Sequence, residues 1–311
     1  MTERYAPVKN ALLANAAHFS NANADSQRIF HGRGHCFPGL AWLTVDYFSP
    51  LILLTVYRGF EGDEAQLQGL TSIVVDFFSE NTTTVNSIVL QRRDLAGAPI
   101  KACWGELPEE AKARRGDLEF TLNFKQQNPG FFLDIEPARY WLEQHCHNKR
   151  VLNLFAYTCA FSVVAAAAGA RSVVNIDMSA RSLRRGRENH AINNIACNGI
   201  SFFAHDIFKS WGKLKKYGPY DIIIIDPPSF QKGSFIAAKD YCKTLRKIPD
   251  LLAPGGVFLA CLNAPEISID TLKGWVSDTL PSATLQQALP VADGFTEREG
   301  EGALKMLVYG V

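Results

Sequence analysis

From Lys149 onward, short β-rich runs alternate with longer helix-compatible stretches, and this alternation strongly constrains the fold. Strands are expected at residues 151–155, 172–177, 200–206, 220–226, 257–262, 283–289 and 303–311. Helices are expected at residues 160–169, 179–194, 237–252 and 268–279, the second with Ser179 as its N-cap. Strands joined by single helices build parallel sheets that are covered on both faces. The sequence therefore predicts an α/β fold with a doubly wound, mostly parallel, seven-stranded sheet.

The first 125 residues have a different pattern. An amphipathic helix is expected from Val8 to Phe19, followed by strand-like tracts at residues 40–48, 51–57, 72–78 and 87–94. Residues 105–117 are charged and turn-prone, which is typical of a linker or an exposed hairpin. We expect two domains: a smaller β-rich module at residues 1–125 and an α/β domain at residues 126–311.

Composition excludes several classes of protein. Hydrophobic residues make up 47% of the chain, and no run approaches the roughly 20 apolar residues that span a bilayer. The N-terminal sequence lacks the basic-then-apolar order of a signal peptide. The seven cysteines form no C-x-x-C pair and no zinc-ligand spacing, so we expect no metal site and a reducing, cytoplasmic location.

Charge is distributed unevenly along the chain. The formal net charge is +1, but residues 181–250 contain 13 Lys and Arg against 6 Asp and Glu, a local excess of 13 − 6 = 7. Such a segment favours a polyanionic partner. The alternative is that these residues form ordinary solvated helix faces.

Acidic residues follow three of the expected strands: Asp177, Asp206 and Asp226. Ligands of open α/β sheets bind beyond the carboxyl ends of the strands. Asp177 is placed to accept hydrogen bonds from a ribose diol, and Asp206 from an adenine amine. No G-x-G-x-x-G or Walker A run is present, so the pattern indicates an adenosine site without a phosphate cradle and disfavours an NAD-dependent dehydrogenase. The alternative for Asp177 and Asp206 is helix or turn capping.

Several motifs together resemble the class I S-adenosylmethionine-dependent methyltransferases, specifically the bacterial 23S ribosomal RNA large-subunit methyltransferases I and K. They are GFFLDIEPAR (130–139), NLFAYTCAFS (153–162), ARSVVNIDMS (170–179), ENHAINN (188–194), AHDIF (204–208), DIIIIDPPSF (221–230) and LAPGGVFL (252–259). The resemblance spans about 280 residues and includes RIFHGRGHCFPGL (28–40), for which a structural turn and a direct RNA contact are both open. It implies the class I fold, S-adenosyl-L-methionine as cofactor, ribosomal RNA as partner, and an RNA-recognition role for residues 1–125.

The resemblance also implies roles for individual residues. Cofactor contacts are implied for Phe132, Asp134, Asn153, Phe155, Ala156, Tyr157, Thr158, Asp177, Met178, Ser179, Asp206 and Asp226. The pocket for the target base is implied for Asp226, Pro227, Pro228, Phe230 and Asn263, with core packing as the alternative for Phe230. The chain departs from the family at Cys159-Ala160, where two glycines are frequent, and at Glu136, where an arginine is usual.

The target atom depends on the end of the fifth α/β strand. Relatives that methylate cytosine C5 have a cysteine there, because the reaction needs a thiolate that attacks C6. Asn263 occupies this position, as in the K-type relatives that methylate guanine N7, and Cys261 lies two residues earlier. We therefore expect methylation of a ring nitrogen. Cytosine-C5 methylation, a protein or small-molecule substrate, and a non-catalytic RNA-binding protein are the alternatives.

Overall fold

The computed structural model describes residues 3–311 except 82, 125, 229, 232–234 and 299–301. The chain forms two compact units. The first contains Met1–Leu133 and Asp293–Arg298, and the second contains Asp134–Ala292 and Glu299–Val311. The functional roles expected for residues 1–125 and 126–311 stay predictions.

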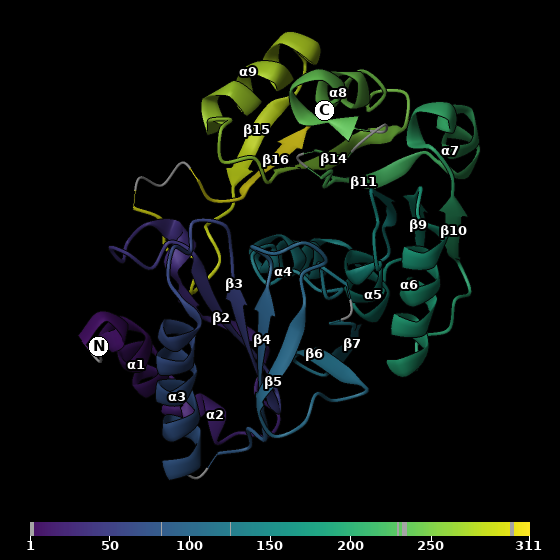
Figure 1. The fold of residues 1–311 in the computed structure, drawn as a ribbon. Helices are drawn as coiled ribbons and strands as arrows, with labels where there is room; N and C mark the ends of the chain where they lie inside the picture. The colour runs from purple at the N-terminus through teal and green to yellow at the C-terminus, as the bar shows by residue number, and fades with distance from the viewer. Residues whose placement is uncertain (1–2, 82, 125, 229, 232–234, 299–301) are drawn as a thin grey trace. The chain divides into compact units, whose positions relative to one another are not determined.

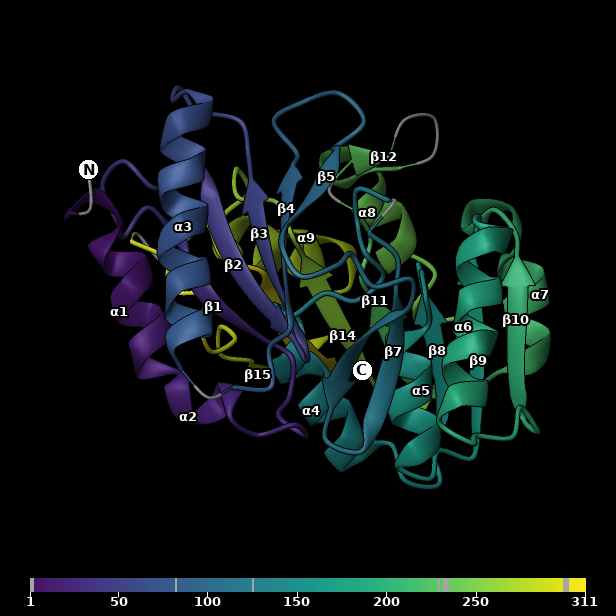
Figure 2. The ribbon, with the colours of Figure 1, turned by 60° about the horizontal axis from the view of Figure 1, so that its bottom comes forward.

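A five-stranded sheet forms the centre of the first unit, in the order β1-β2-β3-β4-β5 (Figures 1 and 2). Its strands are β1 (Gln27–His31), β2 (Leu43–Phe48), β3 (Leu51–Val56), β4 (Ser87–Arg92) and β5 (Ile100–Trp104). Helices α1 (Ala6–Ala14), α2 (Ala16–Phe19) and α3 (Glu64–Glu80) pack their apolar residues on one face of it. Strands β6 (Ala111–Arg115) and β7 (Leu118–Leu122) pair as a hairpin, one of the two forms expected for the charged segment.

The prediction of a strand at residues 72–78 is wrong, because these residues belong to α3. β-branched and aromatic residues favour strands locally. However, Leu67, Leu70, Val74 and Phe78 recur at helical spacing and are all buried on one face. Asp63 caps the helix by accepting a hydrogen bond from the backbone N–H of Gln66. Burial of the helical face outweighs local propensity, and α3 becomes the crossover between the parallel strands β3 and β4.

Residues 293–298 lie near the end of the sequence but belong to the first unit. They pack against β1 and the 3-10 turn Gly32–Gly34 of that unit. The Arg298 N–H donates to the Gly34 carbonyl at 2.7 Å. The Arg28 guanidinium lies 4.4 Å from the centroid of the Phe295 ring. A Cβ on Gly34 would lie 1.9 Å from the Thr296 carbonyl oxygen, so only glycine allows this approach.

The second unit contains the predicted seven-stranded sheet, in the order β10-β9-β8-β11-β14-β16-β15. Its strands are β8 (Arg150–Leu154), β9 (Ser172–Asp177), β10 (Ile200–Ala204), β11 (Tyr220–Ile225), β14 (Leu252–Leu262), β15 (Thr284–Ala288) and β16 (Lys305–Gly310). Strands β10, β9, β8, β11 and β14 pair in parallel, and β16 is antiparallel to both of its neighbours. The predicted fold class is confirmed.

Helices cover both faces of this sheet (Figure 1). On one face lie α4 (Glu136–His145), α5 (Ala160–Ala167) and α6 (Ala180–Ile192). On the other lie α7 (Trp211–Tyr217), α8 (Ala237–Leu245) and α9 (Ile269–Thr279). Helix α8 ends well before the predicted residue 252, since Pro249 has no N–H to continue the helical hydrogen bonds. The short strands β12 (Phe230–Gln231) and β13 (Phe235–Ile236) pair before α8.

The strand order reverses between β8 and β11, which are direct neighbours with Leu154 opposite Ile225. From β8 the chain continues to β9 and β10 on one side, whereas β14 lies beyond β11 on the other. Such a switch point leaves a crevice at the carboxyl ends of the two strands. In this chain those ends continue into Phe155 and Asp226.

Candidate functional site

The segment that follows β8 has an unusual backbone. Phe155, Tyr157 and Cys159 have φ angles of 56°, 47° and 59°, in the left-handed region. Non-glycine residues with such angles cost on the order of 1–3 kcal/mol each and cluster at binding sites. Phe155, Ala156, Tyr157 and Thr158 are four of the residues for which cofactor contacts are implied. The strain is therefore located at the carboxyl end of the strand beside the switch point.

Glycine on the neighbouring helix makes room for the cysteine in this segment. A Cβ on Gly186 of α6 would lie 2.5 Å from the Cys159 sulfur and 2.9 Å from its Cβ. Cys159 is completely buried and begins α5 as its N-cap residue. The departure from the family at Cys159 is thus accommodated by the absence of a side chain at Gly186.

Asp177, at the end of β9, binds the strained segment directly. Its Oδ2 accepts a hydrogen bond from the Tyr157 N–H at 2.9 Å, and its Oδ1 accepts from the Ser179 N–H at 2.8 Å. Burial raises the pKa of this carboxyl above its usual value, and the two N–H donors oppose the rise. Each carboxylate oxygen can accept more than one hydrogen bond, so the outer lone pairs can still receive hydroxyl groups.

Four buried polar side chains are linked by hydrogen bonds beneath the strained segment. Of these four residues, only Asn153 was predicted to belong to the site. Asn153 donates to Asn175 at 3.0 Å, Asn175 donates to Ser162 at 2.9 Å, and Ser162 lies 3.1 Å from His190. These residues join β8, β9, α5 and α6. Burial lowers the pKa of His190, which favours the neutral ring in this network. Asn189 adds a direct hydrogen bond to the Thr158 carbonyl at 3.0 Å.

The other predicted cofactor residues of this unit lie at the ends of β9 and β10. Ser179 is the N-cap of α6, as predicted, and accepts from the Ser182 N–H at 3.1 Å. Met178 is 49% exposed, so its side chain is accessible to a ligand. Asp206 accepts from the Phe208 N–H at 2.9 Å and lies 3.6 Å from the Lys209 ammonium. Capping is therefore one function of Asp206, and a ligand contact stays a prediction.

Asp226 follows β11 and has a strongly shifted ionisation. Burial, together with the charge of Asp134, raises the pKa of its carboxyl to about 7, although the charge of Arg139 opposes the rise. Arg139, on α4, is almost completely buried, and it donates to Glu136 at 3.0 Å. Glu136 stands where the family usually has an arginine, so here it serves as a partner for Arg139. Pro227 beside the acid is buried and fixes the backbone.

Cys261 and Asn263, the two residues used to predict which atom is methylated, have opposite environments. Cys261, in β14, is completely buried in the core beside α4, and burial raises its pKa well above the usual value. Asn263 is the first residue after β14 and is exposed. The side chain of Phe230 lies outside the described part of the structure, as does all of Ser229. Phe132 is 40% exposed and belongs to the first unit.

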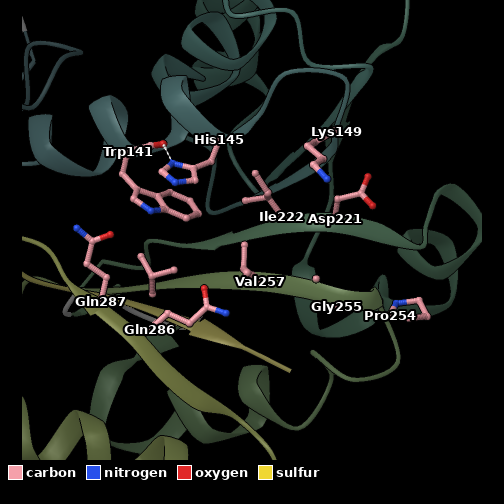
Figure 3. A pocket seen from close by; sticks show the side chains of 12 residues that line it. Trp141, His145, Lys149, Asp221, Ile222, Pro254, Gly255, Val257, Gln286 and Gln287 are labelled. Carbon is pink, nitrogen blue, oxygen red and sulfur yellow. Dashed lines mark hydrogen bonds between the residues drawn. The ribbon is translucent and has the colours of Figure 1, made fainter.

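A hollow of about 290 Å³ lies on the α4 side of the sheet (Figure 3). Trp141 and His145 of α4 stack above it, and Val257 of β14 with Gln286 and Gln287 of β15 lies opposite. Lys149, Asp221 and Gly255 place it where β8, β11 and β14 begin. The hollow therefore lies at the amino ends of these strands, whereas Asp177 and Asp226 lie at carboxyl ends. It is not part of the candidate site.

The described residues contain no group of three or more His, Cys, Asp or Glu placed to hold a metal ion. Within the same residues, no helix has both the length and the apolar character that a membrane span requires.

A seven-stranded sheet with one antiparallel strand, strained backbone after β8 and an acid after β11 defines a class I methyltransferase fold. The sequence agrees over nearly its whole length. Residues 27–310 match the family described as S-adenosylmethionine-dependent methyltransferase, and the chain belongs to this family.

Similar proteins include ribosomal RNA large subunit methyltransferases of two groups. The ribosomal RNA large subunit methyltransferase I of Aeromonas hydrophila is 29% identical over 229 residues, which are 71% of this chain and 57% of that protein. The large subunit methyltransferase K/L of Psychrobacter cryohalolentis is 35% identical over 166 residues, which are 51% of this chain and 21% of that protein. The chain thus spans only part of the length of these relatives.

Solved structures agree in fold. SMU.776, crystallised in complex with SAH, superposes with a TM-score of 0.85 at 24% identity, covering 99% of this chain and 80% of that one. The SAM-dependent methyltransferase of Agrobacterium tumefaciens has a TM-score of 0.68 at 20% identity, covering 94% and 91%. At these identities the likeness shows the fold alone.

Proposed function

We propose that this protein transfers a methyl group from S-adenosyl-L-methionine to a base in ribosomal RNA, with a ring nitrogen as the acceptor. The observation that carries the proposal lies at the carboxyl ends of the adjacent strands β9, β8 and β11. Asp177 follows β9, the strained segment follows β8 and Asp226 follows β11. The names of the relatives support ribosomal RNA as the substrate. The seven free cysteines support a reducing, cytoplasmic location.

The residues at this edge fit the cofactor. Residues 155–158 would hold its methionine part, because the left-handed turns bring the backbone close to the crevice. Asp177 would accept the ribose hydroxyls on the lone pairs that Tyr157 and Ser179 leave available. Met178 and Asp206 would contact the adenine, and Phe132, Asp134, Asn153 and Ser179 would border the site. When bound, the cofactor supplies a methyl group on a positively charged sulfur.

Asp226 would position the target base. Methyl transfer is an in-line displacement, so the protein mainly has to hold the acceptor atom at the correct distance and angle. Asp226 can accept a hydrogen bond from a base N–H, while Pro227 keeps its backbone rigid. We also propose that Phe230 and Asn263 contact the target base. The base must be unpaired or turned out of its stack to enter such a pocket.

The environment of Cys261 supports nitrogen rather than C5 as the acceptor. Attack on C6 of cytosine requires a thiolate. Complete burial in an apolar core raises the thiol pKa and leaves no surface for a substrate. A ring nitrogen carries its own lone pair and needs no covalent catalyst.

The test is labelling of ribosomal RNA that lacks the modification. RNA from a strain without this gene is incubated with radiolabelled S-adenosylmethionine, and the labelled nucleoside is mapped by mass spectrometry. We expect a methylated ring nitrogen, with turnover per folded molecule unchanged in Cys261→Ser. Covalent trapping of the wild type on 5-fluorocytosine RNA, lost in Cys261→Ser, would show C5 methylation instead. Label in protein but not in RNA would refute the RNA substrate.

A further inference from the structure

An exposed arginine of the first unit is held on an unusually constrained turn. Arg33 lies between Gly32 and Gly34 in the 3-10 turn and is exposed, although both glycines are buried. A Cβ on Gly32 would lie 1.9 Å from the Leu40 carbonyl oxygen, and one on Gly34 would lie 1.9 Å from that of Thr296. The backbone on both sides of Arg33 is therefore fixed by close approach to neighbouring chain segments.

Tyr57, directly after β3, lies beside two arginine side chains that are far apart in the sequence. The Arg33 guanidinium lies 4.2 Å from the centroid of its ring, and that of Arg93 lies 5.1 Å away. Arg58 follows Tyr57 in sequence and is exposed. Guanidinium groups stack on aromatic rings by cation–π attraction, and stacking restricts their motion. We call Arg33, Tyr57, Arg58 and Arg93 the Tyr57 cluster.

Within the described residues, no salt bridge neutralises the arginines of the Tyr57 cluster. Arg33, Arg58 and Arg93 form no salt bridge there. Nearby carboxylates already have other cations: Asp46 is paired with Arg28, and Asp94 accepts from Arg92 at 2.6 Å. The charge of Arg93 favours the ionised form of the buried Asp46. Arg33 and Arg58 are the exposed cations of the cluster, and we call them its outward cations.

We propose that the Tyr57 cluster is an RNA-binding surface, in which Arg33 and Arg58 bind phosphates and the stacked guanidinium plane of Arg33 contacts an unpaired base. The inference rests on the proposed function and names a binding surface for the same substrate. RNA fits this surface because guanidinium groups bind phosphate oxygens in pairs and also stack on bases. Immobilised cations lose less side-chain entropy on binding, so the locked turn and the ring both favour association. The segment RIFHGRGH thus combines a structural turn with an RNA contact.

The experiment measures RNA binding and methylation by Arg33→Ala, Arg58→Ala and the control Lys9→Ala. Lys9 is an exposed cation on α1 of the same unit. Binding of a fluorescein-labelled polyuridine is followed by fluorescence anisotropy across a range of salt concentrations. We expect each arginine variant to weaken binding about tenfold, which is the effect of one lost charge-assisted contact. The slope of log affinity against log salt should fall by about 0.7 per variant, and Lys9→Ala should match the wild type.

Methylation separates the failure of this inference from failure of the proposed function. The arginine variants should raise KM for ribosomal RNA and leave the dissociation constant for S-adenosylhomocysteine unchanged. If the wild type methylates RNA and both variants keep its KM and salt slope, the RNA-binding surface is refuted and the proposed function stands. If the wild type neither binds nor methylates RNA, both are refuted. Thermal unfolding of each variant shows that the protein tested is folded.

Discussion

At the scale of single residues, Asp226 combines burial, a neighbouring acid and a neighbouring arginine. Burial and Asp134 raise its pKa to about 7, although Arg139 opposes them. The acid at the end of β11 was predicted from the sequence, because an aspartate followed by two rigid prolines lacks a good packing reason. The nearness of Arg139 was not, since it depends on how α4 packs against the sheet. The same is true of Asn175 and His190, which look like ordinary helix or strand residues until folding brings them together.

The shifted pKa of Asp226 predicts how stability depends on pH. A carboxyl with a folded pKa near 7 and an unfolded pKa near 4 keeps its proton longer in the folded state, so it destabilises the fold as pH rises from about 4 to 7. Asp226→Asn removes this penalty. We expect the variant to have a Tm at least about 4 °C above the wild type at pH 8, and a much smaller difference at pH 4. Differential scanning calorimetry at both pH values measures this, and an equal shift at the two would contradict the buried-acid assignment.

At the scale of elements, the strands of the second unit followed the sequence pattern closely, whereas α4 and α7 were not predicted as helices and α8 ended before the predicted residue 252. In the first unit, one predicted strand is part of a helix. Residues 72–78 look like a strand locally, but their neighbours from Asp63 onward supply a cap and a helical stripe. The left-handed angles at Phe155, Tyr157 and Cys159 were also beyond prediction. Side chains at these positions disfavour such angles, and it is the Asp177 hydrogen bond and the α5 and α6 contacts that hold them there.

The fit between Cys159 and Gly186 can be tested by filling the space. Gly186→Ala improves helix propensity by about 1 kcal/mol, but overpacking a buried contact costs about 1–3 kcal/mol. With 2.5 Å between the new Cβ and the Cys159 sulfur, the segment must shift, so S-adenosylhomocysteine should bind about fivefold to a hundredfold more weakly. Isothermal titration calorimetry gives the constants. The double variant Gly186→Ala with Cys159→Gly should restore binding, because the contact is then removed. If binding is not restored, the contact with Cys159 is not the cause of the loss.

At the scale of the whole molecule, two basic regions are candidates for contacting the same RNA. One is the Tyr57 cluster, and the other is the basic segment of the second unit. Arg184 on α6 and Lys216 on α7 are exposed there. Arg187 and Lys213 instead lie over the rings of Phe202 and Phe203 at 4.5 and 4.0 Å, and cover the edge strand β10. The sequence showed the charge excess but not this division between covering and outward cations.

If the outward cations of the second unit bind phosphates, Arg184→Ala with Lys216→Ala should lower the salt slope of RNA binding by about 1.5. Combined with Arg33→Ala, the free-energy losses should add if the two regions bind different phosphates, because contacts that share no partner are additive. Fluorescence anisotropy with the combined variant measures the sum. A salt slope unchanged by the double substitution would mean that these residues form an ordinary solvated face.

The return of residues 293–298 to the first unit has a consequence for biosynthesis. A ribosome delivers the first 133 residues of this unit and then adds residues 134–292, which are 292 − 133 = 159 residues, before it begins the closing segment. At roughly 5–20 residues per second, this is a delay of about 8–32 s. During that time Gly34 lacks the backbone of Thr296, and Arg28 lacks the ring of Phe295. The turn that presents Arg33 is therefore completed only after most of the methyltransferase sheet has been synthesised.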